Sequence, residues 1–142
     1  MPESCLKMAG YSGTPLAKKL GIKPGAVVCA IEAPRDYETW LAPIPEKVLI
    51  RRSPSQSGAD IVHLFVDALA SLDRELPRAR QAMKVDGALW VSWHKKASRI
   101  PTDVTEDAIR GRALKSDLVD VKICAVTEIW SGLKLVVRKH LR

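Results

Sequence analysis

Three nearly uninterrupted apolar segments constrain the fold of this chain more than any other feature of its sequence. They lie at residues 26–31, 60–66 and 88–93, and none of them alternates polar with apolar side chains. A strand has this composition when both of its faces are covered, as in the middle of a parallel sheet. We therefore expect the three segments to lie side by side as strands, with helices packed against both faces.

Helical patterns occupy much of the sequence around these segments. The predicted helices cover residues 15–20, 36–41, 67–83 and 104–115. Thr14 is expected to cap the first helix, and Gly21 to end it in the left-handed conformation. Pro77 is expected to kink or split the third helix, because proline lacks the amide hydrogen that a helix interior needs. Asp103 and Glu106 have the spacing of a capping box at the start of the fourth.

Further strands are predicted at residues 48–50, 119–127 and 133–137. The last two form an antiparallel hairpin joined around Trp130-Ser131-Gly132. Val85-Asp86-Gly87 is expected to turn the chain into the strand at 88–93. Strands that alternate with helices indicate a three-layer α/β fold with a mainly parallel, Rossmann-like sheet of about six strands.

The C-terminal hairpin narrows the choice among α/β folds. A parallel sheet followed by an antiparallel pair is similar to the arrangement in Rossmann-like, S-adenosylmethionine-dependent methyltransferases. This resemblance implies the strand order 2-1-3-4-6-5. Residues 51–59, between the second and third strands, are too few for the helix that a parallel crossover normally contains. The resemblance therefore implies a reduced version of that fold.

The length of 142 residues suits one domain, which we divide into an N-terminal arm at 1–13 and an α/β domain at 14–142. No segment has the roughly 18 consecutive apolar residues of a membrane span, and the first residues do not resemble a secretion signal. Three cysteines without a CxxC pair fit the reducing cytoplasm, and no group of side chains has metal-ligand spacing. No cofactor can be assigned.

The net charge of +7 is concentrated in the C-terminal part, where residues 84–142 contain 12 basic and 7 acidic side chains. An acidic partner is one explanation, and solubility is the simpler one. Nucleic-acid grooves usually combine denser basic clusters with stacking aromatic residues, and this pattern argues against a nucleic-acid partner.

The carboxyl ends of parallel strands are where ligands bind in open α/β sheets. After the first strand, residues 31–36 contain no glycine and include Pro34, so a standard nucleotide-phosphate site is not expected there. Glu32 could hold ribose hydroxyl groups, although a solvated carboxylate is the simpler interpretation. The loop after the strand at 88–93 is a better candidate, because its basic residues could bind a phosphate or carboxylate. The candidate ligand-binding residues there are Trp93, His94, Lys95, Lys96, Ser98 and Arg99. The alternative is a solvated basic loop.

Two other segments of the sequence are candidates for parts of a binding site. Trp130 and Ser131 are expected at a hairpin tip, where the indole either anchors a partner or folds back onto the core. Tyr11 and Ser12 precede the first helix in a glycine-bearing turn that could hold an anion. No GxSxG motif accompanies a serine, so no catalytic residue is assigned. His63 is expected to be a hydrogen-bonded core histidine, and His140 to be solvated.

Several motifs in a fixed order resemble a known group of proteins. They lie at residues 11–16, 19–21, 89–93 with 95–96, 101–107, 118–122 and 130–134. Together they are similar to the bacterial domain-of-unknown-function family 3052, over about residues 10–138. Many members of that family carry proline where this chain has His94, which argues against an essential histidine acid or base. The resemblance supports the fold and implies no activity.

From the sequence we hypothesise a non-catalytic α/β module that binds an anionic small molecule or an acidic protein partner through Lys95, Lys96 and Arg99, beside Trp93 and Trp130. One alternative is a reduced S-adenosylmethionine-dependent methyltransferase, and another is a weak nucleic-acid binder. A homodimer is also possible, because the last hairpin leaves a sheet edge that a second copy could pair with.

Overall fold

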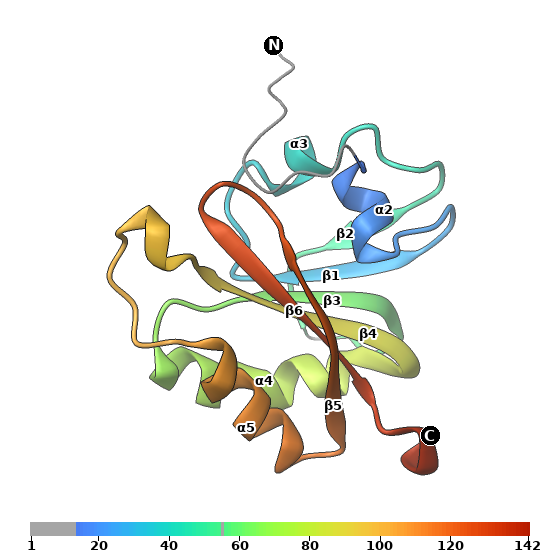
Figure 1. Cartoon of the computed structure of the whole chain (residues 1–142). Coiled ribbons are helices and arrows are strands. Elements are labelled where there is room, and N and C mark those ends of the chain that lie inside the picture. The colour runs from blue at the N-terminus through green and yellow to red at the C-terminus, as the bar shows by residue number, and fades with distance from the viewer. Residues whose placement is uncertain (1–13, 55) are drawn as a thin grey trace.

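The computed structural model describes residues 14–54 and 56–142, which form a six-stranded sheet in the order β2-β1-β3-β4-β6-β5 (Figure 1). The strands are β1 (Val27–Ile31), β2 (Leu49–Arg51), β3 (Ala59–Phe65), β4 (Met83–His94), β5 (Leu118–Ala125) and β6 (Trp130–Val137). The pairs β2–β1, β1–β3 and β3–β4 are parallel, whereas β4–β6 and β6–β5 are antiparallel. The predicted Rossmann-like sheet and its strand order are confirmed.

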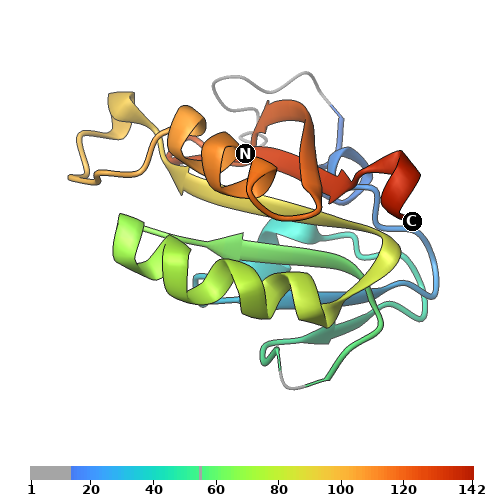
Figure 2. The ribbon, with the colours of Figure 1, turned by 90° about the horizontal axis from the view of Figure 1, so that it is seen from below.

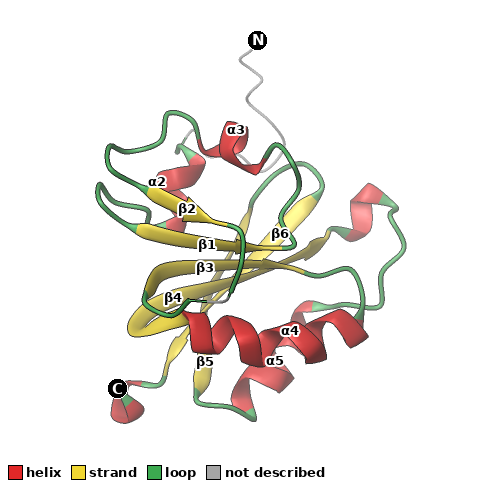
Figure 3. Cartoon of the chain, turned by 180° about the vertical axis from the view of Figure 1, so that it is seen from behind, coloured by secondary structure: helices red, strands yellow, loops and turns green. Residues whose placement is uncertain are grey.

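Helices cover both faces of the sheet. The short helices α2 (Leu16–Leu20) and α3 (Tyr37–Leu41) lie on one face, and α4 (Leu69–Ala82) and α5 (Glu106–Leu114) lie on the other (Figures 1 and 3). Figure 2 shows α4 and α5 side by side across the sheet. Two short 3₁₀ helices, η1 (Lys96–Ser98) and η2 (Lys139–Leu141), complete the described part of the chain. No helix in these residues is long and apolar enough to span a bilayer.

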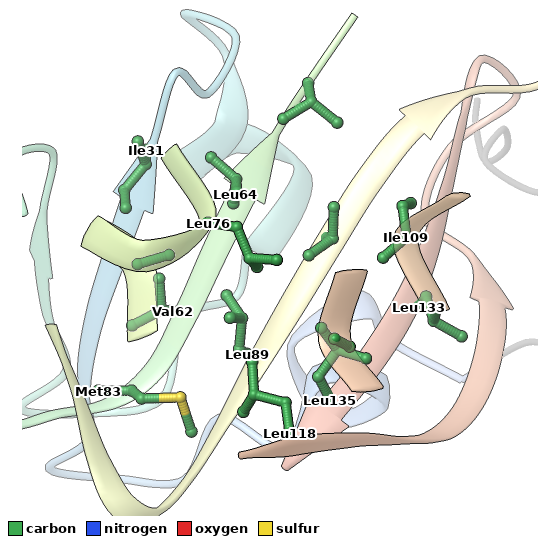
Figure 4. Packing of buried hydrophobic residues seen from close by; sticks show 14 of the residues in the cluster. Ile31, Val62, Leu64, Leu76, Met83, Leu89, Ile109, Leu118, Leu133 and Leu135 are labelled. Carbon is green, nitrogen blue, oxygen red and sulfur yellow. The ribbon is translucent and has the colours of Figure 1, made fainter. Parts of the chain in front are cut away.

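The three apolar segments of the sequence form the central strands β1, β3 and β4. Their alternate side chains fill two hydrophobic cores, one beneath α4 and α5 and one beneath α2 and α3. The first contains Val62, Leu89 and Ile109, all fully buried (Figure 4). Because both faces are buried, these strands need no polar positions, which accounts for their continuous apolar sequence.

Helix α4 is continuous, so the predicted split at Pro77 is wrong. Pro77 cannot donate a backbone hydrogen bond, and its ring crowds the carbonyl of the preceding turn, yet the helix continues through it. The apolar side chains of Leu72, Leu76 and Ala79 are buried against the sheet and hold the helix together across that position. Helix α2 begins one residue later than expected: Pro15 has an extended ψ of 143° and takes the N-cap position assigned to Thr14. Gly21 ends the helix in the left-handed conformation, as predicted.

The predicted turn at Val85-Asp86-Gly87 is also wrong, because β4 runs through it without a break. Gly87 serves a different purpose there. A Cβ atom at this position would lie 2.7 Å from the carbonyl oxygen of Asp60 in β3. Glycine therefore allows β3 and β4 to approach closely where their pairing is irregular.

The turn between β5 and β6 lies at residues 126–129, just before the predicted turn at 130–132. Trp130, Ser131 and Gly132 belong to β6, and the amides of Val126 and Thr127 both donate to the carbonyl oxygen of Trp130. The tryptophan is therefore a strand residue and does not lie at an exposed tip.

A buried chain of hydrogen bonds crosses the core beneath α3. The ring of His63 is fully buried, with Nδ1 2.9 Å from the Tyr37 hydroxyl and Nε2 2.7 Å from the Ser92 hydroxyl. Phe65 stacks on the imidazole at a centroid distance of 4.3 Å. Both ring nitrogens are satisfied, as expected for a core histidine, and burial lowers the pKa of His63 to about 3.

This burial predicts a specific loss of stability in acid. Below its ordinary pKa of 6.5, His63 takes up a proton in the unfolded chain but stays neutral in the folded protein until about pH 3. The free energy of unfolding should therefore fall as pH falls through this range, by up to about 1.4 kcal/mol per pH unit from this group. Chemical denaturation of wild type and His63→Gln at several pH values measures the difference in slope. His140→Gln, altered at an exposed histidine, is the control. Parallel curves for wild type and His63→Gln would refute the prediction.

Candidate functional site

The carboxyl ends of β1, β3 and β4 meet at one edge of the sheet, because the three strands are parallel and adjacent. The strand order reverses between β1 and β3, which is the switch point where open α/β sheets bind ligands. Two clefts open at this edge. We call them the basic cleft and the switch-point cleft.

The basic cleft has a volume of about 620 Å³ and is formed by the end of β4, the loop that follows it and the start of α5. Its lining includes Trp93, His94, Lys96, Arg99, Thr102 and Thr105. Trp93 is only 8% exposed and belongs to the core beneath α4 and α5, together with the buried Val104. Lys96 and Arg99 are exposed. The cleft therefore combines an apolar base with two cationic side chains and one carboxylate, Glu106.

The backbone of this loop is strained at Arg99. Its φ is +62°, in the left-handed region, and its amide closes η1 by donating to the carbonyl oxygen of Lys96. Left-handed backbone costs an L-residue other than glycine roughly 1–2 kcal/mol. The conformation places a basic side chain at the cleft at the expense of stability.

The carboxylates nearest to the cleft in sequence are bound elsewhere. Glu106 and Asp107 both pair with Arg110, the latter at 2.8 Å. Asp103 does not form the predicted capping box with Glu106. Its Oδ1 instead accepts a hydrogen bond of 2.8 Å from the amide of Leu69 at the start of α4.

Thr105 is the N-cap of α5 in place of Asp103, and its Oγ1 accepts from the Ala108 amide. Among the described residues, neither Lys96 nor Arg99 forms an ion pair. Lys96 and Arg99 therefore have no direct ionic partner among these residues, although Glu106 also lines the cleft and the first turn of α5 is acidic.

The structure separates two predicted residues from this cleft. Lys95 donates its amide to the carbonyl oxygen of Ile129, and its ammonium group lies within electrostatic reach of the Cys124 thiol. Burial raises the pKa of that thiol, and the nearby lysines partly offset the rise. The Ser98 hydroxyl donates to the Lys95 carbonyl at 2.6 Å and accepts from the Ile100 amide. Ser98 therefore stabilises the loop itself.

Trp93 and Trp130 do not form one aromatic surface, contrary to the hypothesis that the basic residues lie beside both. In the β4–β6 ladder, Trp93 is opposite Ser131, and His94 is opposite Trp130. Successive residues of a strand point to opposite faces, so the two indoles lie on different sides of the sheet. Trp130 packs at the edge of the core beneath α2 and α3. The predicted Tyr11 and Ser12 lie outside the described residues.

The switch-point cleft has a volume of about 260 Å³ and lies between the ends of β1, β3 and β4 and the first turns of α4. Its lining includes Glu32, Phe65, Asp67, Arg74, His94 and Trp130. The rings of His94 and Trp130 stack at 4.0 Å, and Phe65 meets Trp130 edge to face at 4.9 Å. Burial lowers the pKa of His94, and the charge of Asp67 partly offsets this.

The loop after β1 binds a cation of the protein itself. The guanidinium of Arg52, just past β2, donates to the carbonyl oxygens of Ala33, Pro34 and Arg35 at 3.1–3.3 Å. It also pairs with Glu38, and this hydrogen bond holds the carboxyl pKa below its usual range. A phosphate cradle needs backbone amides directed at the ligand, whereas these groups are carbonyls directed at a guanidinium. The loop whose sequence lacks glycine therefore binds Arg52 through its carbonyl groups.

Sequence reasoning missed the residues that follow β3. Asp67 and the first turns of α4 line the switch-point cleft, but only the segments after β1 and β4 were considered as sites. The rule that drew attention to Lys96 applies equally to Asp67, because β3 lies between β1 and β4. In the described part of the chain, no group of three or more histidine, cysteine or acidic side chains could hold a metal ion.

The fold is similar to those of solved methyltransferase structures. A SAM dependent methyltransferase from Aquifex aeolicus superposes with a TM-score of 0.62 at 11% identity, over 91% of both chains. The ribosomal protein L11 methylase of Lactobacillus delbrueckii subsp. bulgaricus gives a TM-score of 0.53 at 10% identity, over 87% of this chain and 75% of that one. The chain has the fold of S-adenosylmethionine-dependent methyltransferases.

At these identities the similarity concerns the methyltransferase fold alone. No family model matches the sequence, and comparison with curated proteins finds no relative. The resemblance to family 3052 therefore stays a prediction.

Strain at Arg99 leads to a prediction with an internal control. Arg99→Gly and Arg99→Ala both remove the guanidinium, but only glycine adopts a φ of +62° freely. We expect Arg99→Gly to be more stable than Arg99→Ala by about 1 kcal/mol. Equal midpoints in urea denaturation would show that the loop is unstrained.

Asp103 gives a second prediction about the same loop. Asp103→Ala removes the acceptor for the Leu69 amide and should lower the free energy of unfolding by about 1 kcal/mol. Asp36→Ala is the matched control, because Asp36 is the N-cap of α3 but its side chain makes no capping hydrogen bond. Equal losses in the two variants would rule out a capping role for Asp103.

Proposed function

We propose that this chain is a non-catalytic binding module that uses the methyltransferase fold to hold an anionic small molecule in the basic cleft. One observation carries this proposal: Lys96 and Arg99 line the cleft beside Trp93. Neither cation forms an ion pair with a described residue. The neighbouring carboxylates bind other groups directly: Glu106 and Asp107 pair with Arg110, and Asp103 accepts from the start of α4.

The shape and chemistry of the cleft suit a small molecule. Its volume of about 620 Å³ lies within the range of roughly 300–1,000 Å³ that is usual for ligand sites. Trp93 and Val104 supply apolar surface, and the hydroxyl-bearing Thr102 and Thr105 lie along the wall. Charged donors beside partly buried apolar surface bind anions more strongly than the same donors in open water.

Methyl transfer is the second candidate, and the extent of the structural similarity favours it, because the match covers most of this chain. It would require S-adenosylmethionine to bind at the switch point. The carbonyls of the loop after β1 and the guanidinium of Arg52 argue against the usual mode of binding. Membership of family 3052 is compatible with either candidate, since that resemblance implies no activity.

Binding measurements separate the two candidates. We expect pyrophosphate or phosphorylated metabolites to raise the melting temperature, and the Lys96→Ala/Arg99→Ala protein to lose this effect. The control is Arg35→Ala/Lys139→Ala, which removes the same charge from exposed positions outside the cleft. Stabilisation that survives in the cleft variant, or no stabilisation by any anion, would overturn the proposal. Calorimetric binding of S-adenosylmethionine that is insensitive to the cleft variant would favour the methyltransferase candidate.

A further inference from the structure

The two clefts are neighbours that share one residue. His94 lines both of them, because it ends β4 between the loop that forms the basic cleft and the ends of β1 and β3. Two hydrogen bonds join their walls: Thr102 Oγ1 donates to the Asp67 carbonyl at 2.7 Å, and the Leu69 amide donates to Asp103 at 2.8 Å. The segment after β3 and the loop before α5 are therefore held together, which keeps the clefts side by side.

The clefts carry opposite charge. Glu32 and Asp67, which follow β1 and β3, are exposed carboxylates at the switch-point cleft. Neither forms an ion pair with any described residue. Arg74 also lines this cleft, and its Nε donates at 3.0 Å to Glu75, a carboxylate that Arg78 shares. The lining of the switch-point cleft thus holds two carboxylates and one guanidinium, whereas the lining of the basic cleft holds Lys96, Arg99 and one carboxylate, Glu106.

Aromatic rings make the switch-point cleft suitable for an organic cation. Phe65 and Trp130 contribute ring surface to the same small space as the carboxylates. An ammonium group gains from both kinds of neighbour, through charge attraction and through contact with the π-face of an aromatic ring. The described part of the chain lacks a group of ligands for a metal ion, which makes an amine the better match.

The backbone at Glu32 supports a role in binding. Its φ is +57°, in the left-handed region, at the residue directly after β1. Such strain in a residue other than glycine collects at binding sites, because the surrounding structure must maintain it. Among the described residues, Glu32 shares this feature with Arg99 in the basic cleft and with Lys47, which lines neither cleft. Each cleft thus has one charged residue held in a costly backbone conformation at a carboxyl end of the sheet.

We propose that the two clefts form one bipartite site for a dipolar small molecule, with a phosphate or carboxylate in the basic cleft and an organic amine in the switch-point cleft. This inference rests on the proposed binding of anions in the basic cleft and adds the second group of the ligand. One molecule that engages both clefts gains the second contact at high effective concentration. His94 lies at the junction with a buried Nδ1 that has no hydrogen-bond partner among the described residues. It can offer this nitrogen to the linking part of the ligand after a small shift of the ring.

Matched phosphate esters test the inference by calorimetry. One series consists of ω-aminoalkyl phosphates with two to six carbons, and the other of alkyl phosphates of equal length without the amine. For at least one length we expect the amino compound to bind about tenfold more tightly. Glu32→Gln/Asp67→Asn should remove this preference and leave the affinity for the alkyl phosphate unchanged. Lys96→Ala/Arg99→Ala should weaken both series.

A control variant and the pattern of affinities separate failure of the bipartite site from failure of anion binding in the basic cleft. Glu46→Gln/Asp86→Asn makes the same change of charge at exposed positions outside the clefts and should retain the preference. If the double variant of the switch-point cleft folds poorly, Glu32→Gln alone is tested, since its side chain is exposed. Equal affinities in the two series at every length would overturn the bipartite site and leave anion binding intact. Absence of binding in both series would overturn the proposed function and this inference together.

Discussion

The parallel pairing of β1, β3 and β4 is the constraint on which the rest of this structure depends. It buries both faces of the three strands and brings their carboxyl ends to one edge. Every candidate site residue in the described part of the chain lies at that edge or in a loop that starts there. The buried chain from Tyr37 through His63 to Ser92 ties α3, β3 and β4 together beneath the same edge. The strands that end at the clefts are therefore linked by buried hydrogen bonds to both nitrogens of His63.

The loops decide what this fold can do. In an α/β sheet of this order, the segment after the first strand can direct amides toward a phosphate or nucleotide. Here the same segment directs three carbonyls toward Arg52, which reaches it from the end of β2. A guanidinium of the protein thus binds the carbonyl groups of this segment. Similarity to methyltransferases extends to the fold, and this contact belongs to the loop of the present chain.

The charge at the carboxyl edge of the sheet depends on which ionic side chains form ion pairs and which do not. Arg110 pairs with Glu106, Asp107 and Asp120, so these carboxylates are not paired directly with the cations of the neighbouring loop. Beside the other cleft, Glu75 pairs with both Arg74 and Arg78. Pairs such as these contribute little to stability when they are exposed. Their effect is on the local field, because they leave a positive and a negative cleft next to each other.

The sequence by itself determined the central strands, the helices between them and the basic character of the loop after β4. These properties follow from local patterns: continuous apolar segments, amphipathic periodicity, and consecutive lysines after a strand. The resemblance of the C-terminal hairpin to known folds supplied the strand order. His63 could be recognised as a core residue because it lies within an apolar strand.

Only the tertiary structure decided which side chains meet. Trp93 and Trp130 face opposite sides because the antiparallel register pairs Trp93 with Ser131. Asp103 binds the Leu69 amide 34 residues away, and Arg52 binds carbonyls 17–19 residues away. The position of Asp67 beside His94 likewise depends on two strands lying together. Contacts between distant segments depend on register and packing across the whole sheet, and no local pattern in the sequence encodes either of these.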